Sequence, residues 1–183
     1  MPIRIEVMGM PKSGKTRLIH QLIKNSTNDD SQTIPEETVY KFDIFINGSF
    51  EQPVEIWERQ VSEDLKEIVE KPSLPNDITI LVADCDQPNW NKIFHAFKMA
   101  CDKNIRSGEN TLVVIADSYY KGFDPENETN IAEEAEMLGV SRSDLLYCLH
   151  TDNCPELSPM LTKKVEDIVV SSSNFSRFYT YIE

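Results

Sequence analysis

The residues best suited to chemistry form one run near the start of the chain, Gly9-Met10-Pro11-Lys12-Ser13-Gly14-Lys15-Thr16. This run, residues 9–16, matches the phosphate-binding pattern G-x-x-x-x-G-K-[ST]. Glycine lets the backbone curl so that successive N–H groups surround a polyphosphate, and the positive end of a following helix adds to the attraction. The lysine of the pattern reaches the β- and γ-phosphates, and its final hydroxyl binds Mg²⁺. The run therefore predicts a nucleotide site.

The segments on both sides of this run have patterns that would position it. Residues 3–8 form an apolar-rich strand candidate, and residues 16–23 have apolar side chains at helical spacing. A strand, a glycine loop and a helix are the context that the phosphate pattern needs. The alternative is a glycine turn whose lysine points into solvent, and the flanking elements favour the nucleotide site over it.

The rest of the chain alternates between strand and helix patterns. Residues 25–37 are polar and aperiodic, which predicts a loop, and Asn47-Gly48 predicts a hairpin between strands at 38–47 and 51–57. Continuous apolar runs at 78–83 and 111–116 predict strands buried on both faces. A strand is also expected at 145–149, and helices at 60–71, 128–138, 156–170 and along a core stripe of Trp90, Ile93, Phe94, Phe97 and Cys101.

This order of elements predicts the architecture. One antiparallel hairpin within a chain that otherwise alternates strand and helix predicts a three-layer α/β fold with six strands, mostly parallel, and one antiparallel edge strand. No linker and no internal repeat divides the 183 residues. We therefore expect one phosphate-loop domain over residues 1–170, followed by a tail over residues 171–183.

The composition excludes several functional classes. A formal net charge of −13 argues against a nucleic-acid partner and against an anionic membrane. No apolar run approaches the ~20 residues of a membrane helix. The cysteines, Cys85, Cys101, Cys148 and Cys154, form no C-x-x-C pair, so reduced thiols are expected rather than a zinc site. These features predict a cytoplasmic protein without membrane insertion.

The order of elements, with the phosphate pattern starting at residue nine, resembles the Ras superfamily of small GTPases over nearly the whole chain. Val54-Glu55-Ile56-Trp57 resembles the Rab strand that ends in Ile-Trp. Thr33 stands where such GTPases carry the threonine of their first switch, and Glu58 stands where they carry the aspartate that holds Mg²⁺ through water. The resemblance therefore implies a metal site formed by Thr16, Thr33 and Glu58, with a carboxylate longer than the usual one.

Two further positions depart from the family pattern. Val61 replaces the glycine whose N–H senses the γ-phosphate, which weakens the case for a conformational switch. Ser62 replaces the glutamine that orients the attacking water, and its side chain is too short for that role. We therefore expect at most a very slow GTPase and assign no catalytic residue. Arg59 is interpreted either as a stabiliser of phosphate charge or as a solvent-facing arginine.

The segments that would recognise the base are also altered. Asp117-Ser118-Tyr119-Tyr120 stands where a GTPase shows Asn-Lys-x-Asp, and His150-Thr151-Asp152 stands in place of Ser-Ala-Lys. Either Asp117 accepts hydrogen bonds from the base while the tyrosines stack on it, or all of these are ordinary loop residues. Both interpretations stay open. The residues that the resemblance implies as nucleotide contacts are Gly9, Lys12, Ser13, Gly14, Lys15, Thr16, Arg17, Asp117, Ser118, Tyr119 and Thr151.

Among Rab-like proteins, the family of intraflagellar transport protein 22, or Rab-like protein five, shows similar losses. This chain resembles it in Ser-Gly-Lys-Thr at 13–16, in lacking Asn-Lys-x-Asp, and in ending without a cysteine that could carry a lipid. The resemblance implies binding of GTP or GDP with Mg²⁺ and a protein-binding role in the cilium or flagellum. The implied partners are coiled-coil subunits of an intraflagellar transport complex, docked around residues 25–37 and 58–71.

Two other functions stay open. Asp84 and Asp117 each end an apolar run, as the Mg²⁺-binding aspartate of a small phosphate-loop kinase or ATPase does. Such kinases need arginines from a lid to neutralise the transferred phosphate, and the arginines after Lys15 are not clustered in this sequence. The second alternative is a scaffold that binds no nucleotide, and the intact Gly14-Lys15-Thr16 weighs against it.

Overall fold

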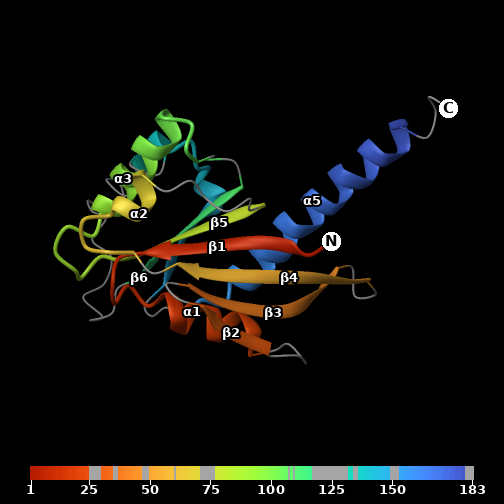
Figure 1. Cartoon of the computed structure of the whole chain (residues 1–183), viewed down its shortest axis with the longest axis horizontal. Helices are drawn as coiled ribbons and strands as arrows, with labels where there is room; N and C mark the ends of the chain where they lie inside the picture. The colour runs from red at the N-terminus through yellow and green to blue at the C-terminus, as the bar shows by residue number, and fades with distance from the viewer. Residues whose placement is uncertain are drawn as a thin grey trace.

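A single mixed sheet forms the centre of the molecule, with helices on both of its faces (Figure 1). The computed structural model describes residues 1–24, 30–34, 37–46, 50–59, 61–70, 77–106, 108, 110–116, 132–133, 136–148 and 153–179. Its strands are β1 (Ile3–Gly9), β2 (Asp30–Ile34), β3 (Glu37–Ile46), β4 (Phe50–Arg59), β5 (Ile78–Asp84), β6 (Thr111–Ala116) and β7 (Leu145–Cys148). The helical segments are α1 (Lys15–Ile23), α2 (Lys66–Val69), α3 (Lys92–Asp102), the short 3₁₀ turn η1 (Arg142–Asp144) and α5 (Leu157–Tyr179).

The strand order within the described residues is β2-β3-β4-β1-β5-β6-β7. Strands β4, β1, β5, β6 and β7 are parallel to one another, and β3 is antiparallel to β4. This arrangement confirms the predicted α/β fold, the antiparallel hairpin and the buried parallel strands. The turn of the hairpin, Asn47-Gly48, lies outside the described residues.

The sheet has a strand that the sequence did not predict. Strand β2 pairs antiparallel with β3, with Thr33 opposite Thr38 and Ile34 opposite Glu37. The described sheet therefore has seven strands rather than six, and β3 is not its outermost strand. The prediction of a loop across residues 30–34 was therefore wrong. Backbone hydrogen bonds hold an edge strand of this kind, so its side chains need not alternate between apolar and polar, and the sequence pattern does not reveal it.

Two apolar cores lie on the two faces of the sheet. Alternate residues of β1 point to opposite sides, so that Ile5 and Val7 join a core with α1 and α5, whereas Met8 joins a core with α2 and α3. The predicted stripe on α3 is confirmed as core packing, since Ile93 and Phe97 are fully buried. Each core holds one layer of helices against the strands that lead into the phosphate loop.

Two predicted helices differ from the observed ones. Helix α2 covers only Lys66–Val69 instead of 60–71, because Leu65 has the left-handed backbone angle φ 58°, which interrupts a right-handed helix. Helix α5 continues to Tyr179, so the domain boundary predicted at residue 170 falls inside it. Its last turns extend past the body of the sheet (Figure 1). Most of the helix predicted at 128–138 lies outside the described residues.

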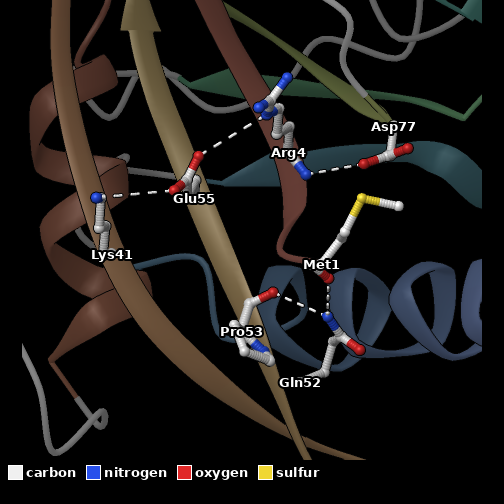
Figure 2. Close-up of polar contacts among 7 residues, drawn as sticks. All are labelled: Met1, Arg4, Lys41, Gln52, Pro53, Glu55 and Asp77. Carbon is white, nitrogen blue, oxygen red and sulfur yellow. Dashed lines mark hydrogen bonds and ion pairs between the residues drawn. The ribbon is translucent and has the colours of Figure 1, made fainter.

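The beginning of β1 is held by polar contacts at the edge of the sheet opposite to the phosphate loop (Figure 2). The Arg4 backbone N–H donates to Asp77 Oδ2 at 2.9 Å, and Gln52 Nε2 donates to the Met1 carbonyl oxygen at 3.2 Å. The Arg4 side chain lies 3.8 Å from the Glu55 carboxylate on β4. These contacts fix β1 between its neighbours and so fix where its far end enters the phosphate loop.

Candidate nucleotide site

The phosphate loop has the predicted setting of strand, tight turn and helix. Strand β1 ends at Gly9 and α1 begins at Lys15. Between them Lys12 and Gly14 adopt left-handed angles, φ 65° and φ 88°, which glycine takes readily. The Ser13 N–H donates to the Met10 carbonyl oxygen at 3.1 Å and closes the turn. The loop therefore curls back before the helix starts, as a phosphate-binding loop does.

Position 9 has room only for a glycine. A Cβ at this position would collide with Ser13 Oγ and with the carbonyl oxygen of Val82, which lies beside Gly9 on β5. Ser13 Oγ is buried and has no hydrogen-bond partner within the described residues. A tightly packed glycine next to a buried hydroxyl without a hydrogen-bond partner in the described residues fits a ligand that offers hydrogen-bond acceptors, such as a phosphate.

Lys15 lies folded over the loop. Its Nζ donates to the carbonyl oxygens of Gly9 and Met10, each at 3.0 Å, and the residue is only 5% exposed. Burial lowers the pKa of Lys15, and the negative charge of Glu58 acts against this shift. A partly desolvated ammonium at the mouth of the loop is suited to an anionic group.

Thr16 and Glu58, two of the three residues predicted as metal ligands, are in contact. Thr16 Oγ1 donates to Glu58 Oε1 at 2.5 Å, although 42 residues separate them in the chain. The parallel register of β1 and β4 places Glu58 opposite Val7, just before the loop. A hydroxyl and a carboxylate oxygen are hard ligands of the kind that Mg²⁺ takes, so this donor set fits the metal.

Thr33, the third predicted metal residue, lies farther away along the sheet. Its backbone in β2 pairs with Thr38 of β3, and Thr38 in turn pairs with Glu58 of β4. Two strand spacings separate its backbone from that of Glu58 by about 10 Å. Its role as a metal ligand therefore remains a prediction that requires β2 to move.

The other predicted nucleotide contacts divide into two groups. Lys12 and Arg17 are exposed at the loop and on the first turn of α1. Asp117, Ser118, Tyr119 and Thr151 lie outside the described residues. Strand β6 ends immediately before Asp117, and β7 ends three residues before Thr151. Both strands run parallel to β5, which is parallel to β1. Their carboxyl ends thus share the sheet edge where the phosphate loop begins.

Asp84, the alternative metal residue, ends β5 close to the loop. It is 7% exposed, and its Oδ1 accepts the Asp86 N–H at 3.1 Å. Thr16 Oγ1, the hydroxyl of the phosphate pattern, contacts Glu58. The geometry therefore favours Glu58 over Asp84 as the carboxylate that acts with the loop.

Arg59 is neither solvent-facing nor available to a phosphate, so both interpretations of this residue were wrong. Its Nε lies 2.8 Å from Glu6 Oε1, and both side chains are buried. Arg106 Nη1 donates to Glu6 Oε2 at 2.7 Å. We call Glu6, Arg59 and Arg106 the ion cluster. Successive strand residues face opposite sides, so Arg59 points away from the face that holds Glu58.

The ion cluster also reaches α2. Arg106 Nε donates to the Ile68 carbonyl oxygen at 3.2 Å, and burial lowers the pKa of Arg106. Val61, Leu65 and Ile68 are buried in the core beside α3. Local sequence patterns could not reveal this cluster, because 100 residues separate Glu6 from Arg106.

The two positions that depart most from a GTPase have settled roles here. The side chain of Val61 is buried in the same core as Leu65 and Ile68. Ser62 Oγ donates to Asp64 Oδ1 at 2.6 Å. Hydrogen bonds from Ser62 and Lys66 lower the pKa of Asp64 to about 2. The Ser62 hydroxyl therefore directs its proton to Asp64, within its own segment.

Sequence reasoning missed Tyr40, which contacts Glu58. Tyr40 Oη donates to Glu58 Oε2 at 3.1 Å from a buried position on β3. The register of the hairpin places Tyr40 opposite Ile56, which shares the face of β4 that holds Glu58. The predicted hairpin thus contained a signal for this residue.

Comparisons with known proteins support the fold. No family model and no curated protein matched this chain. Among solved structures, it is similar to the G domain of the T. maritima FeoB iron transporter, with a TM-score of 0.52 and 15% sequence identity. The match covers 91% of this chain and 98% of the other. None of the described helices has the length and apolar character needed to cross a membrane. The chain therefore has the fold of a small GTPase-like G domain.

Proposed function

We propose that this chain binds a purine nucleoside triphosphate with Mg²⁺ through residues 9–16, with GTP preferred to ATP, and can retain GDP. The observation that carries the proposal is the contact between Thr16 Oγ1 and the buried Glu58 carboxylate at the end of an intact phosphate loop. The G-domain-like fold supports guanine as the base.

The residues of the site have distinct roles in this proposal. Backbone N–H groups of the loop and the N-terminus of α1 surround the phosphates, and Lys15 exchanges its contacts with loop carbonyls for phosphate oxygens. Thr16 and Glu58 would hold Mg²⁺, which supplies positive charge beside the phosphates. Asp117 and Tyr119 are proposed to contact the base, with Ser118 and Thr151 beside them.

Hydrolysis is proposed to be very slow, at or below the ~10⁻⁴ s⁻¹ scale of an unassisted small GTPase. Ser62 is engaged with Asp64, and Arg59 is engaged with Glu6. Neither side chain can therefore orient water or stabilise phosphate charge from its present position. Rapid phosphate release in a single-turnover assay without a partner would contradict this part of the proposal.

We propose further that the protein acts by binding another protein, with the nucleotide as a conditional ligand. The first partner to test is a coiled-coil heterodimer of an intraflagellar transport complex, on the strength of the sequence resemblance alone. The proposed docking surface includes β2 and the segment around α2. The ion cluster and apolar packing already hold α2 in place. We therefore expect bound nucleotide to order mainly the part of the docking surface that β2 forms.

Isothermal titration tests nucleotide binding. Wild type should bind GTP with Mg²⁺, and Lys15→Ala should lose binding while its circular dichroism stays unchanged. Lys98→Ala is a matched control, because Lys98 lies on the exposed side of α3 and pairs only weakly with Asp102 at 3.6 Å. Equal GTP affinity of wild type and Lys15→Ala would refute the site.

A pull-down tests the protein-binding role. Lys15→Ala should recover less of the coiled-coil heterodimer than wild type, although Lys15 is buried and does not form the docking surface. Equal recovery would show that nucleotide does not control partner binding. Failure of folded wild type to bind the heterodimer would refute the assignment to intraflagellar transport while leaving the nucleotide site intact.

A further inference from the structure

The Tyr40 hydroxyl is fixed on one oxygen of Glu58. Tyr40 is 5% exposed and Glu58 is 3% exposed, so their 3.1 Å hydrogen bond is shielded from water. The His20 ring meets the Tyr40 ring edge-on, with centroids 5.8 Å apart and an interplanar angle of 79°. His20 lies one turn after Thr16 on α1, so the same helix carries the hydroxyl ligand and the residue that braces Tyr40.

Glu58 needs such a partner more than an aspartate would. A glutamate has one more rotatable bond than an aspartate, so its carboxylate can occupy more positions and loses more entropy when it is fixed. In this chain the two carboxylate oxygens have different partners, Oε1 with Thr16 and Oε2 with Tyr40. The two hydroxyls approach from α1 and β3, and together they define how the carboxylate lies.

We propose that Tyr40 is a positioning residue of the Mg²⁺ site, which holds Glu58 Oε2 so that Oε1 faces the metal beside Thr16. The inference rests on the proposed function. Groups that hydrogen-bond to a ligating carboxylate orient it and commonly change metal affinity by 10–100-fold when removed. Tyr40 thereby restricts the longer side chain of Glu58 at the position where the Ras superfamily carries an aspartate.

The test is a Mg²⁺ titration of GTP affinity in Tyr40→Phe, which removes the hydroxyl and keeps the ring. We expect the Mg²⁺ concentration for half-maximal enhancement of affinity to rise about tenfold, with GTP affinity in EDTA unchanged. Tyr147→Phe, a hydroxyl deletion on β7, is the matched control and should titrate as wild type does. In a Glu58→Gln background, Tyr40→Phe should have no further effect.

Three outcomes would overturn the inference. An unchanged Mg²⁺ requirement in Tyr40→Phe would show that the hydroxyl does not position Glu58. An equal loss of GTP affinity with Mg²⁺ and in EDTA would show that Tyr40 acts through packing of the loop, and thermal unfolding of the variant would report that packing change separately. Absence of any Mg²⁺-dependent GTP binding in wild type would overturn the proposed function together with this inference.

Discussion

Glu58 and Arg59 are consecutive residues of β4, yet they belong to different parts of the molecule. Glu58 faces α1, where its carboxylate meets the hydroxyls of Thr16 and Tyr40. Arg59 faces α2 and α3, where its guanidinium is paired with Glu6. The alternation of strand side chains thus separates the Glu58 carboxylate, beside the phosphate loop, from the Arg59 guanidinium, which is paired with Glu6 on the other face. Adjacent charged residues at the end of a strand therefore need not share a site.

The two faces also differ in what holds them. On the α1 face, Thr16 is exposed beside the loop, so ligand atoms can reach the Thr16–Glu58 pair. On the opposite face, Arg106 links the ion cluster to Ile68, and the apolar side chains around α2 are buried. The α1 face thus places an exposed hydroxyl beside the phosphate loop, where we propose that a ligand binds, whereas the α2 face is held by contacts within the chain.

The largest expected effect comes from breaking the ion cluster. Glu6→Gln removes the carboxylate that two buried guanidinium groups share and leaves uncompensated charge inside the protein. We expect the free energy of unfolding to fall by about 3–5 kcal/mol, measured by denaturant titration. The matched control is Glu55→Gln on β4, whose ion pairs with Arg4 and Lys41 are 3.8 Å long and partly exposed. This control should change stability by less than about 1 kcal/mol, and equal losses in the two variants would refute a special role for the cluster.

A smaller loss of stability is expected in the phosphate loop. In Gly9→Ala, the new methyl group collides with Ser13 Oγ and with the Val82 carbonyl oxygen, so the loop must shift. We expect about 1–3 kcal/mol of destabilisation together with a loss of GTP affinity. Gly108→Ala is the control and should cost less, because its new methyl group makes a tight contact with the Leu138 carbonyl oxygen, at 3.2 Å, but does not overlap it as the methyl group at position 9 would overlap its neighbours. A Gly9→Ala protein with normal stability and GTP affinity would show that the loop is not closely packed.

The smallest effect concerns Asp64, on the exposed segment before α2. Hydrogen bonds from Ser62 and Lys66 hold the pKa of Asp64 at about 2, below the ordinary 3.8. The unfolded chain therefore binds this proton more readily, and the contribution of Asp64 to stability is present above pH 4 and is lost as the pH falls toward 2. Ser62→Ala should raise the pKa of Asp64 toward 3.8 in a carboxyl NMR titration. An unchanged pKa would place the cause of the shift elsewhere.

Local patterns were enough to predict much of the fold. The phosphate loop, the hairpin and the buried strands at 78–83 and 111–116 all carry signals within a few residues, from glycine spacing or continuous apolar character. Strand β2 lacked such a signal because backbone pairing with β3 holds it. Helix α2 was predicted too long because the left-handed Leu65 leaves the apolar spacing unchanged while it interrupts the helix.

The candidate site was predictable only in part. The phosphate pattern and the resemblance together identified Thr16 and Glu58, which the structure brings into contact. The positions of Arg59 and Tyr40 depend on which face of the sheet each one occupies and on partners far away in the chain. Glu6 lies 100 residues from Arg106, so no window of sequence contains their ion pair.

The most direct test of the account compares the two neighbours on β4 in one experiment. Glu58→Gln and Arg59→Gln are each measured for the Mg²⁺ enhancement of GTP affinity by calorimetry and for the free energy of unfolding by denaturant titration. Glu58→Gln should lose the Mg²⁺ enhancement with a stability change of only about 1 kcal/mol, because glutamine can keep hydrogen bonds to Thr16 and Tyr40. Arg59→Gln should lose about 3 kcal/mol of stability and keep the Mg²⁺ enhancement. Retention of the enhancement in Glu58→Gln, or its loss in folded Arg59→Gln, would contradict the division of roles between the two faces.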